Sequence, residues 1–118
     1  MAKKKFEEPV CALDYAFRRI GGKYKARILW YIHNENNTLR YGELKRMLRN
    51  ITSKMLTQTL RELEEDKLIN RKVYREVPPK VEYSLTDTGK ELIPFIDHLG
   101  AWGEKQMQKE EFKKLSKV

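Results

Sequence analysis

The spacing of apolar residues changes between residues 53 and 86, and this change constrains the fold most. In residues 53–66 leucines recur every three or four positions, which indicates a helix with one buried face. In residues 69–77 and 81–85 the side chains alternate in character, which indicates two half-buried strands. Pro78-Pro79 interrupts ladder pairing between them, so we predict a β-hairpin with its tip near Pro78 to Lys80.

The segments on either side of this region have helical patterns. Leu13, Phe17 and Ile20 share one helical face, and Gly21-Gly22 ends that helix. The predicted elements, in order, are helices over residues 12–20, 25–33 and 41–48, the helix over 53–66, the hairpin, and a closing helix capped by Thr86. Helix, short turn, helix and hairpin is the order of a winged helix-turn-helix, so the predicted fold class is mainly α with a small β-hairpin (α+β). An ordinary α+β domain can share this order.

A chain of 118 residues is long enough for one domain with a single core. We predict a flexible basic N-terminal arm over residues 1–9, a winged helix-turn-helix domain with terminal dimerisation helices over 10–108, and a charged C-terminal tail over 109–118. No apolar run reaches the ~20 residues that span a bilayer, and the first residues lack the apolar core of a signal peptide. We therefore expect no membrane partner. The single cysteine, Cys11, has no internal disulfide partner, which agrees with a reducing compartment, so we expect a cytoplasmic protein.

The positive charge is concentrated in one half of the chain. The whole sequence has a net charge of +8 at pH 7. Residues 1–61 contain 14 Lys and Arg against 5 Asp and Glu, a net of +9, whereas residues 62–118 contain 11 against 12, a net of −1. This asymmetry favours a polyanionic partner such as DNA, although a basic solvated surface would also produce it.

The helix over residues 53–66 has the polarity that a major-groove helix needs. Its core face is leucine, its outward face is polar and basic near the start, and acidic residues close its far end. Its first N–H groups and the positive end of its dipole could approach phosphates. With the hairpin and the start of the third helix, the predicted DNA-binding residues are Arg40, Ser53, Lys54, Thr57, Gln58, Arg61, Arg75 and Lys80. We assign Ser53 and Lys54 to phosphates and the other three residues of that helix to base edges. The alternative is that these side chains are only solvated.

A second apolar stripe, in the closing helix, is too wide for one small core. Together with two residues of the first helix it predicts a homodimer seam. The predicted seam residues are Leu13, Phe17, Phe95, Ile96, Leu99, Trp102 and Met107. A two-fold dimer would present its two recognition helices to successive major grooves, roughly 34–36 Å apart. Ordinary core packing is the alternative, above all for Leu92 and Leu99.

The pattern gives no support for catalysis. His33 and His98 have no carboxylate or cysteine partner at a metal or triad spacing, so we predict no catalytic residue, metal or cofactor. The leading hypothesis is a sequence-specific transcriptional regulator that binds double-stranded DNA. A winged-helix protein-interaction module is the main alternative, but it would expose apolar anchors on the helix over 53–66. A thiol enzyme built on Cys11 and a non-specific DNA-packaging protein are further alternatives.

Four motifs follow one another in the chain and can be compared with known families. They are Ile20-Gly21-Gly22-Lys23-Tyr24-Lys25, the segment from Ile51 to Glu64, Val77-Pro78-Pro79-Lys80-Val81-Glu82-Tyr83-Ser84-Leu85-Thr86, and Trp102-Gly103. In these motifs, within residues 11–103, the chain resembles the HxlR-type branch of bacterial winged-helix regulators, which is related to the MarR-like proteins. The resemblance implies a homodimer that binds a near-palindromic operator, often as a repressor and sometimes as an activator.

The resemblance also concerns Cys11. Some members of the family sense electrophiles or oxidants through a cysteine near the N-terminus. The resemblance therefore implies a candidate redox sensor at Cys11. The thiol could oxidise or pair with the partner's Cys11, with a small electrophile or oxidant as the signal. Alternatively, Cys11 could be a packed residue, as many cysteines are.

The sequence departs from the family pattern at three positions. Tyr24 replaces the usual Trp, and Tyr41 replaces the usual Phe. Lys67 stands where glycine is usual, and a glycine there would accept the left-handed conformation that ends a helix. Lys67 must therefore bear that strain, or the helix must end differently.

Overall fold

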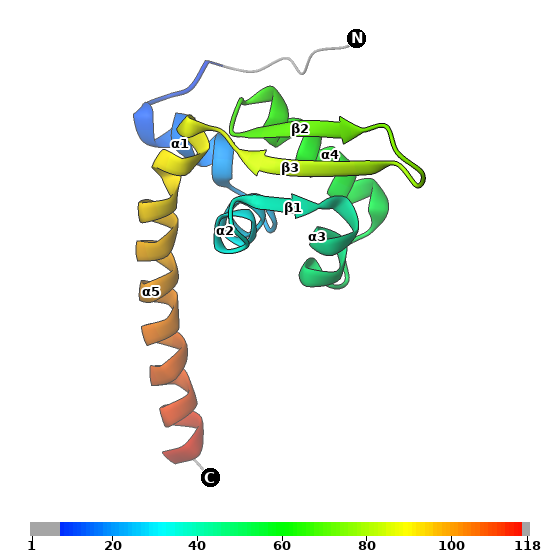
Figure 1. Cartoon of the computed structure of the whole chain (residues 1–118). Helices are drawn as coiled ribbons and strands as arrows, with labels where there is room; N and C mark the ends of the chain where they lie inside the picture. Colours follow the sequence, from blue (N-terminus) through cyan, green and yellow to red (C-terminus); the bar gives the residue numbers. More distant parts are fainter. Residues whose placement is uncertain (1–7, 117–118) are drawn as a thin grey trace.

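Five helices and three strands make up residues 8–116, the part of the chain that this computed structural model describes (Figure 1). The elements are α1 (Ala12–Ile20), α2 (Lys25–Asn34), β1 (Thr38–Arg40), α3 (Tyr41–Leu48), α4 (Ser53–Glu65), β2 (Ile69–Tyr74), β3 (Lys80–Leu85) and α5 (Asp87–Ser116). The order confirms the predicted winged helix-turn-helix: mostly helical with a small antiparallel sheet. Most of the predicted N-terminal arm, residues 1–7, lies outside the described residues.

The sheet has the order β1-β3-β2, and both pairings are antiparallel. β1 is an element that the sequence analysis missed; Leu39 pairs with Tyr83 across it. β2 ends at Tyr74, three residues before the predicted end of the first strand. The predicted half-burial of that strand is largely wrong, because only Ile69 is fully buried and Val73 is exposed. The sheet is therefore covered by helices mainly at its base, and the hairpin projects beyond them as a wing (Figure 1).

One apolar core joins α2, α3 and α4 to the sheet and to the start of α5. Its fully buried large side chains come from three helices and a strand: Ile28, Leu29, Ile32, Leu44, Leu56, Leu60, Leu63 and Ile69. The leucine stripe predicted for the fourth helix is thus confirmed as its core face. Burying a leucine side chain contributes about 1.5–3 kcal/mol, so this stripe fixes the rotation of α4 about its axis.

The beginning of α5 is tied to the end of α4 through one threonine. The Thr86 hydroxyl accepts a hydrogen bond from the Gly89 N–H at 2.9 Å and donates one to the Lys67 carbonyl at 2.7 Å. This confirms Thr86 as the cap of the closing helix. A side chain at Gly89 would collide with the Leu68 carbonyl oxygen, so glycine permits this close approach.

Beyond its first turns, α5 leaves the domain. Ile93 and Ile96 are buried, whereas the described side chains from Leu99 to Glu111 are exposed or only partly buried. The helix runs past Pro94 and continues through most of the predicted charged tail, to Ser116. The residues after Gly103 include no glycine or proline and are mainly strong helix formers, which explains why the charged composition does not end the helix.

α4 ends in a backbone conformation that places Lys67 in the left-handed region. The Leu68 N–H donates to the Leu63 carbonyl at 3.0 Å, and the Lys67 N–H donates to the Glu64 carbonyl at 2.9 Å, which together form a Schellman motif. Lys67 itself has φ of 59°, in the left-handed region. The helix therefore ends as it would with a glycine, and Lys67 bears the strain.

We expect Lys67→Gly to stabilise the fold by about 0.5–1 kcal/mol. Left-handed backbone costs a side-chain-bearing residue roughly 1–2 kcal/mol, and the greater flexibility of unfolded glycine cancels part of the gain. Urea unfolding of wild type, Lys67→Gly and Lys67→Ala measures this. The alanine variant removes the same charge but keeps Cβ, so it should stay within about 0.5 kcal/mol of wild type. Equal stability of the two variants would contradict the explanation.

Candidate nucleic-acid interface

The exposed side of α4 begins at a well-formed N-terminus. The Thr52 hydroxyl accepts the Met55 N–H at 3.0 Å, so Thr52 is the N-cap and Ser53 is the first helical residue. The Ser53 hydroxyl is therefore not needed for capping and lies exposed beside Lys54. At this end the first backbone N–H groups and the helix dipole favour an anion such as phosphate.

The predicted DNA-binding residues of α4 share its outer side, although they differ in exposure. Ser53, Lys54, Gln58 and Arg61 are exposed, whereas Thr57 is half-buried. Thr59, which was not predicted as core, is buried, and its hydroxyl donates to the Met55 carbonyl at 2.7 Å. Apart from one apolar side chain, Met55, the outer surface is therefore polar, basic over most of its length and acidic at its end, where Glu64 and Glu65 are exposed.

Tyr41, the first residue of α3, braces α4 and was missed by the site prediction. Its hydroxyl donates to the Ser53 carbonyl at 3.2 Å and lies 3.3 Å from the Thr57 hydroxyl. It therefore fixes the first two turns of α4 against α3. A phenylalanine at this position could not make these bonds, and the sequence alone did not show that the Tyr41 hydroxyl had partners.

A hollow of about 490 Å³ lies between α4 and the sheet, and Arg61 lines it together with Arg71 and Tyr83. Burial raises the pKa of the Tyr83 hydroxyl, and the hydrogen bond and charge of Arg71 oppose the shift. Tyr83 thus stays protonated at neutral pH, and Arg71 is held beside it. Arg71 was not predicted as a site residue; the alternating strand pattern gave no sign that it would lie next to Arg61.

A second hollow, of about 610 Å³, lies between the start of α3 and the wing. Arg40, Arg46 and Lys80 line it, together with the wing residues Pro78 and Pro79. The Arg40 N–H donates to Glu43 Oε1 at 2.9 Å, which holds the beginning of α3 in place. Tyr41 and Val81 line both hollows, so α4, the start of α3 and the wing form one continuous surface, which we call the groove face.

The two predicted wing contacts differ. Arg75 is exposed near the tip. Lys80 is more enclosed: its Nζ lies 3.7 Å from Glu82 Oε2 and 4.2 Å from the centre of the Tyr74 ring. The Tyr74 ring also faces Lys72, at 4.8 Å. A phosphate contact by Lys80 would therefore compete with these neighbours, whereas Arg75 is the more accessible cation.

The predicted seam lies on the other side of the domain, where Figure 1 shows α1 and α5 far from the wing. α1 has no buried residue at all. Six of the seven predicted seam side chains are more than half exposed: Leu13, Phe17, Phe95, Leu99, Trp102 and Met107. We call these six the apolar seam. Leu99 is thus exposed and not part of the core, contrary to the alternative that the sequence left open.

Ile96 departs from the prediction. Only 8% of it is exposed, and it packs into the chain's own core. Ile96 and the exposed Leu99 are three residues apart and lie on the same apolar stripe of α5. The stripe is wide because it serves two purposes: one edge faces the core and the other faces outward.

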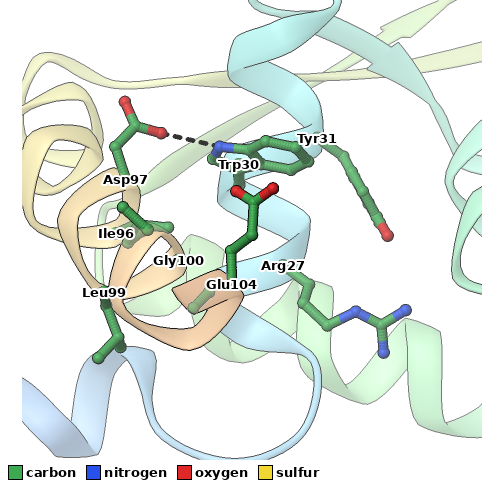
Figure 2. A pocket seen from close by; sticks show the side chains of 10 residues that line it. Arg27, Trp30, Tyr31, Ile96, Asp97, Leu99, Gly100 and Glu104 are labelled. Carbon is green, nitrogen blue, oxygen red and sulfur yellow. Dashed lines mark hydrogen bonds between the residues drawn. The ribbon is translucent and has the colours of Figure 1, made fainter. Parts of the chain in front are cut away.

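A hollow of about 560 Å³ separates α2 from α5 beside the seam (Figure 2). Within it the Trp30 indole N–H donates to Asp97 Oδ1 at 2.8 Å, and Glu104 lines the same hollow (Figure 2). This bond joins α2, which belongs to the core, to the part of α5 that carries the seam. It therefore helps to set the direction in which α5 leaves the domain.

Cys11 is the N-cap of α1 and is exposed, so the alternative of a packed core cysteine is wrong for this chain. Its own side chain makes no capping bond. The Val10 N–H instead donates to Asp14 Oδ2 at 3.0 Å, and this bond, helped by Arg18 and opposed by burial, holds the pKa of Asp14 below its usual value. The thiol therefore sits at the start of a helix whose apolar face is uncovered.

Among residues 8–116, no helix is both long and apolar enough to cross a membrane. Within the same residues, no group of three His, Cys, Asp or Glu side chains is arranged to hold a metal ion.

Comparison with known proteins gives consistent results. The family model described as HxlR-like helix-turn-helix matches residues 19–111. The HTH-type transcriptional regulator YtcD of Bacillus subtilis, itself uncharacterised, is 50% identical over 103 residues, which cover 87% of this chain and 78% of YtcD. The solved structure of the redox regulator HypR in its reduced form has a TM-score of 0.78 and 39% identity, covering 86% of this chain and 98% of HypR. Its oxidised form has a TM-score of 0.75 and 41% identity, covering 80% and 96%.

Proposed function

Because the chain belongs to the HxlR-like helix-turn-helix family and is a transcriptional regulator of the helix-turn-helix type, we propose that it acts as a homodimer on a near-palindromic operator, with α4 in the major groove. The observation that carries the proposal is the groove face. The exposed basic N-terminal half of α4, the start of α3 and the wing border two hollows that share Tyr41 and Val81.

The assignment of residues follows the geometry of α4. Ser53 and Lys54, at its N-terminus, are proposed to contact phosphates, whereas Gln58 and Arg61 reach base edges. Thr57 reaches less far, because it is half-buried and bonded to Tyr41. Arg40 and Arg75 are proposed to contact the backbone on either side, with Lys80 as a supporting contact.

The apolar seam supports the homodimer. An amphipathic helix with no buried residue, α1, lies on the same side of the domain as an apolar edge of α5. A second copy of the chain is proposed to cover both, since an isologous interface places the same surface on each side of a two-fold axis. We further propose that the bound dimer represses, because a protein that occupies two successive grooves excludes others from the same DNA. No catalytic role is proposed.

The protein-interaction alternative is less well supported. Such a module would present apolar anchors on α4, yet Met55 is the only large apolar residue exposed there. The other exposed residues of α4 are Ser53, Lys54, Gln58, Arg61, Glu64 and Glu65. Equilibrium binding separates the two functions. DNA from beside its own gene should bind about 10³-fold or more tighter than random DNA at physiological salt. Equal affinity for both would overturn sequence-specific regulation.

We also propose that Cys11 makes the regulator responsive to thiol chemistry. The observation that favours this is an exposed thiol at the start of α1, beside the apolar seam, in a chain similar to a redox regulator. In the electrophile route, the sulfur would add to a ring carbon of a quinone and the thiol proton would pass to the quinone oxygen, which leaves a hydroquinone thioether. In the disulfide route, two Cys11 thiols would lose two protons and pass two electrons to the oxidant. Either change alters how α1 packs in the seam.

The test is operator binding before and after treatment with hydrogen peroxide or with an electrophilic quinone. Wild type should change its operator affinity several-fold, and a thiol reductant should reverse the effect of peroxide. Cys11→Ser should bind like untreated wild type under all conditions, because its hydroxyl is inert to both reagents. The same response from wild type and Cys11→Ser would rule out the cysteine as sensor.

A further inference from the structure

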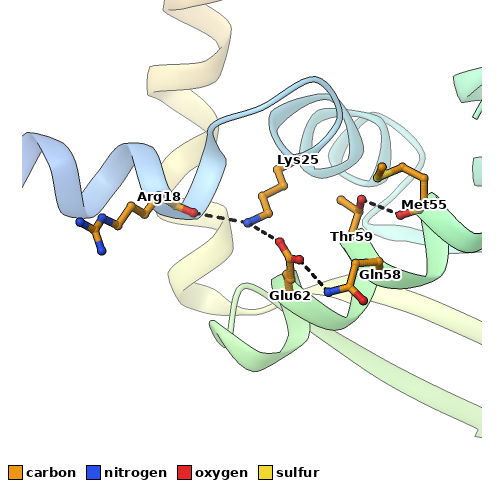
Figure 3. Close-up of polar contacts among 6 residues, drawn as sticks. All are labelled: Arg18, Lys25, Met55, Gln58, Thr59 and Glu62. Atoms are coloured by element: carbon orange, nitrogen blue, oxygen red, sulfur yellow. Dashed lines mark hydrogen bonds and ion pairs between the residues drawn. The ribbon is translucent and has the colours of Figure 1, made fainter. Parts of the chain in front are cut away.

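The amide of Gln58 is oriented by a chain of polar contacts that reaches back to α1 through the partly buried side chains of Glu62 and Lys25 (Figure 3). Gln58 Nε2 donates to Glu62 Oε2 at 2.8 Å. The other carboxylate oxygen, Oε1, lies 3.0 Å from Lys25 Nζ, which also donates to the Arg18 carbonyl at 3.3 Å. One lysine therefore joins the last turn of α1, the start of α2 and the last turn of α4.

These contacts are partly shielded from water. The side chains of Lys25 and Glu62 are only 15% and 20% exposed. Glu62 meets Lys25 as a carboxylate, and a carboxylate can only accept hydrogen bonds. The Gln58 amide must then turn its nitrogen toward Glu62, which leaves its oxygen on the far side; Figure 3 shows that oxygen pointing away from Glu62. Lys25 also offsets a negative charge that would otherwise repel DNA phosphates.

We propose that Glu62 is a specificity-determining positioning residue, which fixes Gln58 as a hydrogen-bond acceptor toward the major groove. The inference rests on the proposed function. In the major groove, adenine N6 and cytosine N4 present amino donors, whereas guanine and thymine present keto oxygens that need a donor. An unrestrained glutamine amide can turn to suit either class. An amide held by Glu62 favours the amino bases at the position it reaches.

The experiment measures binding to operator duplexes in which each position carries all four bases in turn. Wild type should prefer adenine or cytosine over guanine and thymine by about fivefold or more at one position of each half-site. Gln58→Ala should abolish this preference. Glu62→Ala should reduce it to less than about twofold while leaving the preferences at other positions unchanged.

Two further variants distinguish the loss of Gln58 orientation from unfolding and from the simple removal of a negative charge. Glu62→Ala leaves Lys25 unpaired and could unfold, so the double variant Lys25→Met with Glu62→Met removes the whole ion pair without stranding a charge. It should lose the preference in the same way. Glu65→Ala removes a negative charge from the exposed surface of the same helix, without touching Gln58. It should bind all the duplexes more tightly yet keep the preference.

The inference alone is overturned if wild type binds its operator but the double variant keeps the full amino-base preference. It is equally overturned if Gln58→Ala changes no position, or if the position that it changes favours a keto base. Wild type that shows no sequence-dependent binding would instead overturn the proposed function, and this inference with it.

Discussion

Leu99→Glu is expected to make the protein monomeric and to lower its operator affinity by about 100-fold or more. Leu99 lies in the apolar seam and is 55% exposed in the single chain, so the substitution should leave the domain folded. A carboxylate buried against a second apolar surface is strongly unfavourable. In a dimer, binding of one protomer to its half-site holds the other protomer close to the second half-site. Such linkage raises affinity by about 10²–10⁴, and a monomer loses this gain.

Gln108→Glu is the matched control. Gln108 is exposed on the opposite side of the same helix, and the substitution changes the net charge by the same amount. Sedimentation or light scattering at micromolar concentration, far-ultraviolet circular dichroism and an operator titration are measured for wild type and both variants. The control should remain dimeric and bind like wild type. A Leu99→Glu variant that is still a dimer with full affinity would show that the seam lies elsewhere.

Arg61→Ala is expected to remove discrimination at one base position of each half-site. Arg61 is exposed on the groove face, and a good bidentate contact to guanine is worth about 1–3 kcal/mol, or roughly 5- to 150-fold. The loss should be confined to operators with the preferred base at that position. On operators with another base there, the variant should bind about as well as wild type.

Lys54→Ala is the comparison, because it removes the same charge from the same helix. A phosphate contact carries no sequence information, so this variant should weaken binding to all sequences alike. It should also reduce the slope of log affinity against log salt by about 1 for each protomer. If neither substitution changes operator binding, α4 is not the groove helix.

Local periodicity made α4 and its core face predictable. Leu56, Leu60 and Leu63 are close in sequence and lie on one helical face whatever the rest of the chain does. Thr86 was predictable as a cap for the same reason, since a cap depends on the next three residues.

The bracing of the site depends on contacts between distant segments. Tyr41 reaches Ser53 and Thr57 only because α3 and α4 pack together, and Lys25 reaches Glu62 only because α2 crosses α4. Neither pairing has a spacing that can be read from the sequence. β1 was missed because three residues are too few to show a period of two.

The apolar stripe on α5 shows a second limit of prediction from sequence. Ile96 and Leu99 have the same character and a helical spacing, yet one is buried and the other exposed. Periodicity reveals that a face is apolar, but not which of its edges the chain itself covers. That depends on where α2 lies, which the bond from Trp30 to Asp97 helps to determine.

Hydroxyl-radical footprinting on an operator selected by the wild-type protein tests the central claim most directly. Two copies of α4 related by a two-fold axis should protect two patches centred one helical turn apart, about 10–10.5 base pairs, with symmetric sequences beneath them. A single protected patch, or protection that does not depend on sequence, would contradict a dimer that places α4 in successive major grooves.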